Sequence, residues 1–369
     1  MAGPEIGVIY GDRGLEMADR LLHKLNIGEK LSLRNASVGI KPNLVLPKTS
    51  EKGATTDPQI VAGIIEYVKS FGPAEIKIME SSWVGASTEQ AFNICGYRKL
   101  AEKYDVNLVN LKRDNLKTFS VGREKIKVCQ QAAEVDILIN VPVLKAHCQT
   151  KMTCALKNLK GCIPDAEKRR YHREGLHKPI ALLNKVLSSD LIVVDGIYGD
   201  LTFEEGGNPV KMDRVFAGLD PVLVDSYAAH LLALEPAEIG YLEHAVRLGL
   251  GSNDLAGAEI NEINTPVGRS NPGEQISEIA ERLSQKYIKN KSACSACYGN
   301  LIQALHRLDE SGDLGSFSTS ICIGQDFRGQ KKECPGIGNC TAKFSQNVSG
   351  CPPTASEIVD FFQNKILDT

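Results

Sequence analysis

The first two thirds of the chain alternates short apolar runs with amphipathic stretches, and this alternation constrains the fold more than any other feature of the sequence. Strands that alternate with helices are typical of an α/β domain. Strands are expected within residues 5–10, 36–40, 74–79, 135–144 and 191–194. Helices are expected over residues 14–25, 57–72 and 220–234, with Asp57 and Asp220 as N-caps. The sequence therefore predicts an α/β fold with a mainly parallel sheet, or sheets, flanked by helices.

The length of the chain predicts more than one domain. With 369 residues and 42% apolar content, it can bury a large core. Residues 261–275 are rich in Pro, Gly, Asn and Ser, which favours a linker there. We therefore expect an α/β domain over residues 1–270, built as one or two lobes, and a small cysteine-rich α+β module over residues 271–369.

Charge and apolar patterning exclude several classes of partner. The 43 Lys and Arg nearly balance the 45 Asp and Glu, which argues against a general affinity for nucleic acid or anionic membranes. The N-terminal residues do not resemble a signal peptide, and no apolar run is as long as a membrane span. These features predict a soluble cytoplasmic protein that binds neither nucleic acid nor membrane, and they leave its oligomeric state open.

Polar side chains follow four of the predicted strands. In chain order these are Lys41 with Asn43, Glu80 with Ser81, Lys145 with His147, and Asp195. Ligands of open α/β sheets bind beyond the carboxyl ends of the strands. Any one of these residues could instead be an ordinary polar loop residue, but four such strand ends favour a binding crevice.

The densest group of polar residues lies between residues 140 and 177. A short predicted helix carries Lys157 and Asn158 and ends at Gly161, and a basic loop with His172 follows. Cations around one crevice favour an anionic ligand, such as a carboxylate or phosphate, or the acidic edge of a redox partner protein. The alternative is that the lysines lie on a solvated helix face and the basic loop is exposed.

We expect these residues to converge on one pocket, with candidate ligand-binding residues Lys41, Asn43, Glu80, Lys145, His147, Lys157, Asn158 and His172. In an enzyme, His147 or His172 would be the acid or base, because histidine titrates near neutrality without perturbation. Asp195 would orient one of the two histidines. These three residues are the catalytic candidates.

Six of the eleven cysteines lie after Lys291, and four of them have metal-binding features. Cys294 and Cys297 form a CxxC motif that opens a predicted helix. Cys340 follows a glycine-rich turn, and Cys351 stands between a glycine and two prolines. Glycine lets the backbone approach inorganic sulfide, and proline after a ligand recurs in iron–sulfur loops. Structural disulfides are disfavoured in a reducing compartment.

We therefore predict a [4Fe–4S] cluster held by Cys294, Cys297, Cys340 and Cys351, with Cys334 in reserve. Zinc is the alternative, because CxxC is also common in zinc sites. A zinc ribbon usually pairs two CxxC motifs, however, and the second half of this module has none. Cys322 lies in an apolar segment, where a buried thiol behaves as a small hydrophobic side chain.

Several motifs carry a family resemblance. In order they are KPNLV, TTDP, NVPVLKAHCQTKMTCALKNLKG, VVDGI and GLDPVLVD. Over about residues 38–254 the chain resembles the family called domain of unknown function 362. The resemblance implies an iron–sulfur protein of anaerobic or redox metabolism. It also implies a distant similarity in fold to the nickel-pincer lactate racemases, whose full histidine pattern this sequence lacks.

The leading hypothesis is a cytoplasmic iron–sulfur protein that transfers electrons, with a basic crevice for an anionic ligand or a redox partner protein. The second hypothesis is an enzyme, of oxidoreductase type, that acts on a carboxylate or phosphate substrate and uses the cluster structurally. The third is a maturation or binding factor without turnover.

Overall fold

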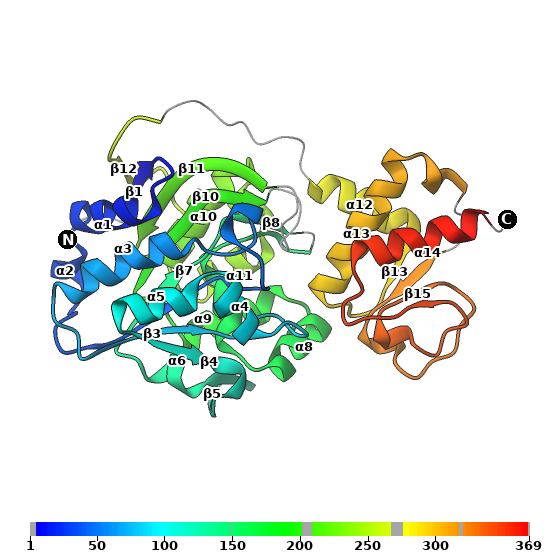
Figure 1. The fold of residues 1–369 in the computed structure, drawn as a ribbon, viewed down its shortest axis with the longest axis horizontal. Helices are drawn as coiled ribbons and strands as arrows, with labels where there is room; N and C mark the ends of the chain where they lie inside the picture. Colours follow the sequence, from blue (N-terminus) through cyan, green and yellow to red (C-terminus); the bar gives the residue numbers. More distant parts are fainter. Residues whose placement is uncertain (1–4, 148, 201–208, 267–275, 317–319, 368–369) are drawn as a thin grey trace.

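A computed structural model describes residues 5–147, 149–200, 209–266, 276–316 and 320–367. A large α/β lobe and a smaller C-terminal lobe lie side by side (Figure 1). The boundary predicted near residue 270 falls outside the described residues.

The large lobe is built on one eight-stranded sheet. In spatial order its strands are β12 (Glu259–Glu262), β1 (Glu5–Tyr10), β11 (Pro209–Gly218), β10 (Leu191–Asp200), β7 (Ile137–Val141), β2 (Ser37–Pro42), β3 (Glu75–Glu80) and β4 (Asn107–Asn110). Neighbouring strands are parallel except at β11, which is antiparallel to β1 and β10. The predicted α/β fold with a mainly parallel sheet is confirmed.

Helices cover both faces of this sheet (Figure 1). One apolar cluster packs against α1 (Gly14–Lys24), α3 (Pro58–Lys69), α4 (Thr88–Ile94) and α5 (Tyr97–Tyr104). The other packs against α7 (Ala155–Asn158), α9 (His177–Val186), α10 (Pro221–Leu231) and α11 (Gly240–Arg247). Along β10, Val193 belongs to the first cluster and Val194 to the second, as the two-residue period of a strand requires. The predicted N-caps Asp57 and Asp220 both accept backbone N–H groups of their helices.

Smaller elements complete the large lobe. They are α2 (Ile27–Lys30), α6 (Gln130–Glu134), α8 (Asp165–Glu174) and the hairpins β5 (Leu116–Val121) with β6 (Glu124–Cys129) and β8 (Lys145–His147) with β9 (Lys151–Thr153). Helix α8 corrects the expectation of a basic loop after Gly161. Acidic residues occupy its first turn, and Arg170 pairs with Glu167 and Glu174 at helical spacings.

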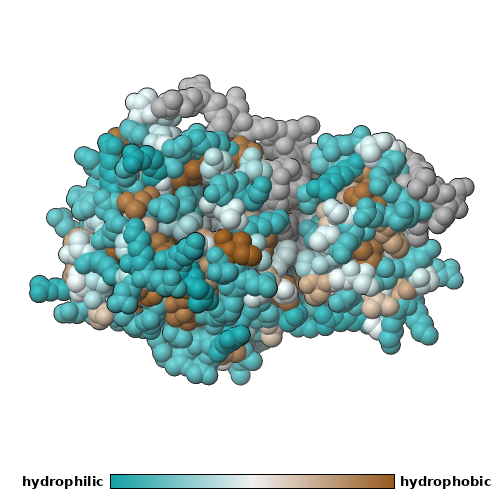
Figure 2. Space-filling model, viewed as in Figure 1, coloured by the Kyte–Doolittle hydropathy of each residue, from teal (hydrophilic) through white to brown (hydrophobic). Residues whose placement is uncertain are grey.

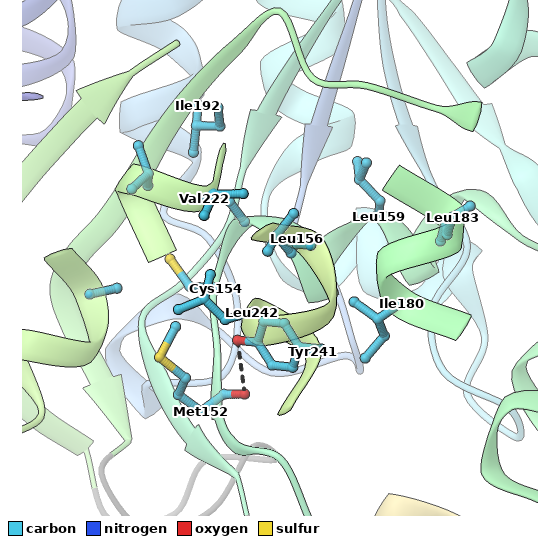
Figure 3. Close-up of a cluster of buried hydrophobic side chains, with 14 of the residues drawn as sticks. Met152, Cys154, Leu156, Leu159, Ile180, Leu183, Ile192, Val222, Tyr241 and Leu242 are labelled. Atoms are coloured by element: carbon cyan, nitrogen blue, oxygen red, sulfur yellow. Dashed lines mark hydrogen bonds between the residues drawn. The ribbon is translucent and has the colours of Figure 1, made fainter. Parts of the chain in front are cut away.

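Helix α7 is short but firmly anchored. Leu156 lies in the apolar cluster with Val222 and Leu242, and nearby the Tyr241 hydroxyl donates to the Met152 carbonyl at 3.5 Å (Figure 3). The buried Asp225 carboxylate accepts the Ala155 and Leu156 N–H groups at 2.7 and 3.2 Å. These contacts fix the helix that carries Lys157 and Asn158.

The C-terminal lobe has its own sheet and core. Its four strands are parallel, in the order β13 (Ile288–Asn290), β14 (Ile321–Ile323), β15 (Gly336–Ile337) and β16 (Asn347–Val348). Its helices are α12 (Ile276–Tyr287), α13 (Ser295–Glu310) and α14 (Ala355–Leu367). Leu301, Leu305, Ile321, Ile358 and Phe362 belong to a separate apolar cluster.

The face in Figure 2 is mostly hydrophilic, with small separate apolar patches. The large apolar side chains exposed in the described part of the chain are Ile94, Leu116 and Leu219. Within the same residues, no helix combines the length and apolarity needed to cross a bilayer.

Candidate functional site: a lysine cavity beside four cysteines

The candidate site lies where the order of the sheet reverses. The chain runs outward from β2 to β3 and β4, then returns to β7 on the other side of β2. Such a reversal opens a crevice at the carboxyl ends of the strands. A cavity of about 110 Å³ lies there, lined by residues that follow β2 and β3 and by residues of α7 and α8. We call it the lysine cavity, because its walls include Lys41, Lys145, Lys157, Lys160 and Lys168.

A buried ion pair forms the floor of the lysine cavity. Lys41 Nζ lies 2.9 Å from Glu80 Oε2, and neither side chain is more than 3% exposed. Glu80 also accepts the N–H groups of Leu44 and Ser81 at 2.8 and 2.7 Å. A Cβ at Gly161 would lie 2.1 Å from Glu80 Oε1, so the chain can pass there only as glycine. Close backbone approach, rather than the predicted helix end, therefore explains Gly161.

Two asparagines connect this ion pair to Lys145. Asn158 Oδ1 accepts from Lys41 Nζ at 3.2 Å and from Asn43 Nδ2 at 2.8 Å. Asn43 Oδ1 in turn accepts from Lys145 Nζ at 2.9 Å. The amide nitrogen of Asn158, Nδ2, donates to Asn140 Oδ1 at 2.8 Å. A fully bonded buried network holds its side chains in one arrangement, so these groups are preorganised.

Helix α8 closes one side of the cavity. Lys168 Nζ donates to Ser81 O, Ser81 Oγ and Ser82 O at 2.8, 2.6 and 2.7 Å. Burial lowers the pKa of Lys168 to about 8. The role of Lys168 is to hold α8 over the end of β3. His172 follows one helical turn later and lines the cavity.

The structure brings together seven of the eight predicted ligand-binding residues, namely Lys41, Asn43, Glu80, Lys145, Lys157, Asn158 and His172. The prediction that His147 lines the same cavity is wrong. Its imidazole is buried, and Nδ1 accepts the Gln149 and Thr150 N–H groups at 3.0 and 3.1 Å. His147 therefore holds the turn between β8 and β9.

Asp195 also has a different role from the one predicted. Its carboxylate accepts the Asp57 N–H at 2.8 Å and the Ile197 N–H at 3.0 Å. Asp195 thus joins β10 to the start of α3 and is not among the described residues that line the cavity. Burial raises the pKa of Asp195 to about 7.

This raised pKa predicts a pH-dependent stability. The carboxyl group ionises near pKa 3.9 in the unfolded chain but near 7 in the fold, so the folded protein holds the proton longer. The contribution of Asp195 to the free energy of unfolding is therefore greatest below about pH 4. It falls by up to about 4 kcal/mol as the pH rises to about 7, and it is constant at higher pH. Asp195→Asn should remove this part of the slope in urea unfolding between pH 4 and 8. Burial also raises the pKa of Asp225 to about 7 and raises the pKa values of Asp57 and Asp190, so part of the slope should remain. An unchanged slope would contradict the prediction.

The four predicted metal ligands surround a second pocket, which we call the thiol pocket. Cys294, Cys297, Cys340 and Cys351 line it, together with glycines of the C-terminal lobe. Cys294 is the N-cap of α13, and Cys297 lies in the first turn of that helix. At Gly338, where φ is +84°, a Cβ would lie 2.9 Å from Cys297 Sγ. Glycine therefore leaves open the space in front of this thiol.

Two side chains donate hydrogen bonds to these sulfurs. Arg328 Nε lies 3.4 Å from Cys340 Sγ, and Gln325 Nε2 lies 3.6 Å from Cys294 Sγ. Burial raises the pKa of Cys294, and Lys160 and Arg169 of the large lobe oppose that rise. In the described part of the chain, no three His, Cys, Asp or Glu side chains are grouped closely enough to hold a metal ion. The four thiols share one pocket without forming a closed ligand set.

The other two C-terminal cysteines form a pair of their own. Cys334 Sγ lies 2.8 Å from Cys322 Sγ, and neither residue lines the thiol pocket. Cys322 lies in strand β14 and is buried, as expected. Cys334, the predicted reserve ligand, therefore lies beside Cys322 and does not line the thiol pocket.

The lysine cavity and the thiol pocket are neighbours. Val84 and Cys294 line both. Gln325 Nε2 donates to the Arg169 carbonyl at 3.2 Å, which joins the two lobes beside the thiols. Sequence reasoning missed Trp83, Val84 and Thr153 in the cavity, and Gln325 and Arg328 beside the thiols. The one signal in the sequence was that the single tryptophan of the chain follows a predicted strand end.

Comparison with known proteins identifies the family. The sequence model described as domain of unknown function (DUF362) matches residues 38–230. The chain belongs to this family. The family region contains all seven cavity residues named above, whereas the four cysteines of the thiol pocket lie beyond it.

Individual relatives are more distant. A thylakoid-associated protein of Synechocystis is 29% identical over 222 residues, which cover 57% of this chain and 67% of the relative. The lactate racemase apoprotein of Thermoanaerobacterium thermosaccharolyticum is 13% identical, with a TM-score of 0.39 over 66% of this chain and 57% of that one. A Thermotoga maritima protein is 14% identical, with a TM-score of 0.41 over 61% of this chain and 60% of that one. The chain thus spans less than two thirds of either solved structure.

Proposed function

We propose that this DUF362 protein is an iron–sulfur protein of electron transfer, in which Cys294, Cys297, Cys340 and Cys351 hold a [4Fe–4S] cluster and the lysine cavity binds a small anion. One observation carries the proposal: Cys294 lines both the thiol pocket and the lysine cavity. A ligand in the cavity is thereby next to the thiols.

The chemistry of the side chains in the thiol pocket supports this proposal. Thiolates are the ligands that iron–sulfur clusters use, and a bound cluster supplies one-electron transfer. The glycine at position 338 keeps a side chain out of the space before Cys297. Cys294 and Cys297 lie at the N-terminus of α13, and Arg328 donates a hydrogen bond to Cys340 Sγ. Zinc remains the alternative metal, because it also accepts four thiolates.

The lysine cavity favours a small anion over a docked protein. Its volume of about 110 Å³ suits a compact carboxylate or phosphate. Lys157 donates to Thr153 Oγ1 at 2.8 Å, which directs its ammonium group along the cavity wall. Lys160 and His172 add positive or hydrogen-bonding groups. Carboxylates and phosphates are the ligands that such charge-assisted donors bind.

A second candidate function is an enzyme whose cluster is structural. It is favoured by His172, the histidine that lines the cavity in the described part of the chain. Histidine at that position could exchange a proton with a bound carboxylic or phosphoric acid near neutral pH. His172→Gln should then abolish turnover but leave the cluster potential nearly unchanged. The proposed site of action is the cytoplasm, where reducing conditions keep cysteines as thiols.

The lysine cavity should bind inorganic phosphate or oxalate, and Lys157→Gln should weaken that binding at least tenfold. The reason is the loss of a charged donor at a largely buried site, worth about 1.5–3 kcal/mol. Isothermal titration at two salt concentrations measures the effect. Lys151→Gln is the matched control, because Lys151 is 38% exposed and pairs with Glu238 at the surface. Equal affinities of the two variants would place the anion elsewhere.

Anion binding and the cluster should also influence each other, and this tests the proposed function directly. Reduction adds negative charge beside Cys294, so it should weaken anion binding, and by reciprocity the anion should lower the reduction potential. A tenfold difference in affinity corresponds to about 59 mV for one electron. Potentiometry with and without oxalate measures the shift. An anion that binds without any shift would contradict the functional link between the two sites.

A further inference from the structure

Cys322 and Cys334 form a site that the proposed function does not use. Their sulfurs are 2.8 Å apart, about 0.8 Å more than the length of a disulfide bond. Cys322 belongs to β14 and Cys334 lies two residues before β15. The Cys322 N–H donates to the Pro335 carbonyl at 2.8 Å, which fixes the two segments side by side.

The surroundings of the pair combine burial with positive charge. Cys322 is 1% exposed and packs with Phe327 and Phe344. Cys334 is only partly buried, so a reagent reaches it first. Burial and the neighbouring Cys334 raise the pKa of Cys322, while Lys289 and Lys332 act in the opposite direction. The net shift of the Cys322 pKa is upward, so Cys322 stays a thiol and the more exposed Cys334 is the one that reacts first.

We propose that Cys322 and Cys334 are a redox-active dithiol that closes to a disulfide by exchange with small-molecule disulfides. The Cys334 thiolate attacks a disulfide RSSR, forms a Cys334–SR mixed disulfide and releases one RS⁻. The Cys322 sulfur then attacks Cys334 Sγ and releases the second RS⁻, and the two thiol protons go to the two released thiolates. The protein loses two electrons and two protons, and RSSR becomes two RSH.

Closing this bond affects the thiol pocket through the segment between the two cysteines. That segment carries Gln325 and Arg328, the donors to Cys294 Sγ and Cys340 Sγ. A disulfide joins the two ends of the segment and restricts its motion. The dithiol itself rests on the geometry of Cys322 and Cys334, so it stands whether or not the thiol pocket holds a cluster.

The full-length protein, purified without oxygen, is incubated with oxidised glutathione and then denatured in acid. Free thiols are labelled with a maleimide, and the protein is digested with trypsin. We expect wild type to lose the label at both cysteines. It should also yield one cross-linked peptide whose mass is the sum of the two free peptides minus two hydrogen atoms. Arg328, Lys331 and Lys332 place Cys322 and Cys334 on separate tryptic fragments. Cys334→Ser should leave Cys322 fully labelled.

Two controls keep the test sharp. Cys340 shares the tryptic fragment of Cys334, so Cys340→Ser must retain the cross-link if the assignment is correct. Cys154, buried in the large lobe, should remain labelled throughout. The proposal is overturned if both thiols stay free in excess oxidised glutathione, if the bond joins Cys322 to Cys340, or if glutathione remains attached to Cys334. None of these readouts involves iron or anion binding, so their failure would leave the proposed function unaffected.

Discussion

Replacing Cys351 with serine is expected to remove most of the iron and acid-labile sulfide from protein purified without oxygen. We expect wild type to contain about four of each per chain, the composition of one cubane cluster. Cys351 lines the thiol pocket with three other cysteines, and an alkoxide is a poorer ligand than a thiolate for soft iron. Colorimetric iron and sulfide assays, with electron paramagnetic resonance of the reduced protein, measure the loss.

Cys322→Ser is the matched control for this prediction. Cys322 lies in the same lobe but beside Cys334, outside the thiol pocket. This variant should keep its iron and sulfide, although it loses folding stability and the Cys322–Cys334 dithiol. Stoichiometric zinc without sulfide in wild type would defeat the iron–sulfur proposal, and full occupancy in Cys351→Ser would remove that residue from the ligand set.

Glu80→Ala should lower the free energy of unfolding by about 3–5 kcal/mol. The change leaves the Lys41 ammonium buried without its carboxylate, and it also removes the acceptor of the Leu44 N–H. Urea unfolding followed by circular dichroism measures the loss. The asparagine network meets this ion pair at Asn158, so anion binding by the lysine cavity should weaken as well.

Glu75→Ala provides the comparison on the same strand. Glu75 pairs with Lys77 at 2.8 Å, but the two side chains are 39% and 21% exposed. Exposed ion pairs contribute at most about 1 kcal/mol, so this variant should be nearly as stable as wild type. Similar losses of unfolding free energy in the two variants would show that the buried Lys41–Glu80 pair stabilises the fold no more than an exposed pair does.

The sheet and much of the lysine cavity can be predicted from the sequence because both depend on local patterns. Apolar runs of strand length mark β2, β3, β7 and β10, and polar residues at their ends mark the crevice. Parallel strands bring their carboxyl ends to one edge, so Lys41, Glu80 and Lys145 can be placed together without coordinates. The caps of α3 and α10 are equally local.

The errors have both local and tertiary causes. His147 and Asp195 follow strands as the cavity residues do, but His147 accepts N–H groups of its own turn. Asp195 accepts the N–H of Asp57, which is distant in the sequence. The sequence of α8 is so polar that it predicts a loop, and its helix depends on ion pairs and on Lys168 docking against Ser81. The pairing of Cys334 with Cys322 depends on the register of β14 and β15.

Cys294 contributes to the lysine cavity from outside the family region. The lysines and this part of the cavity wall therefore belong to different lobes of the chain. In a family member without this C-terminal lobe, the same strand ends would face solvent and could admit a longer ligand. With a different C-terminal lobe, other side chains would lie opposite the charged strand ends, and the site could bind a different ligand. We expect ligand size within the family to vary with the lobe joined to the family region, and the positive charge at the strand ends to stay with the sheet.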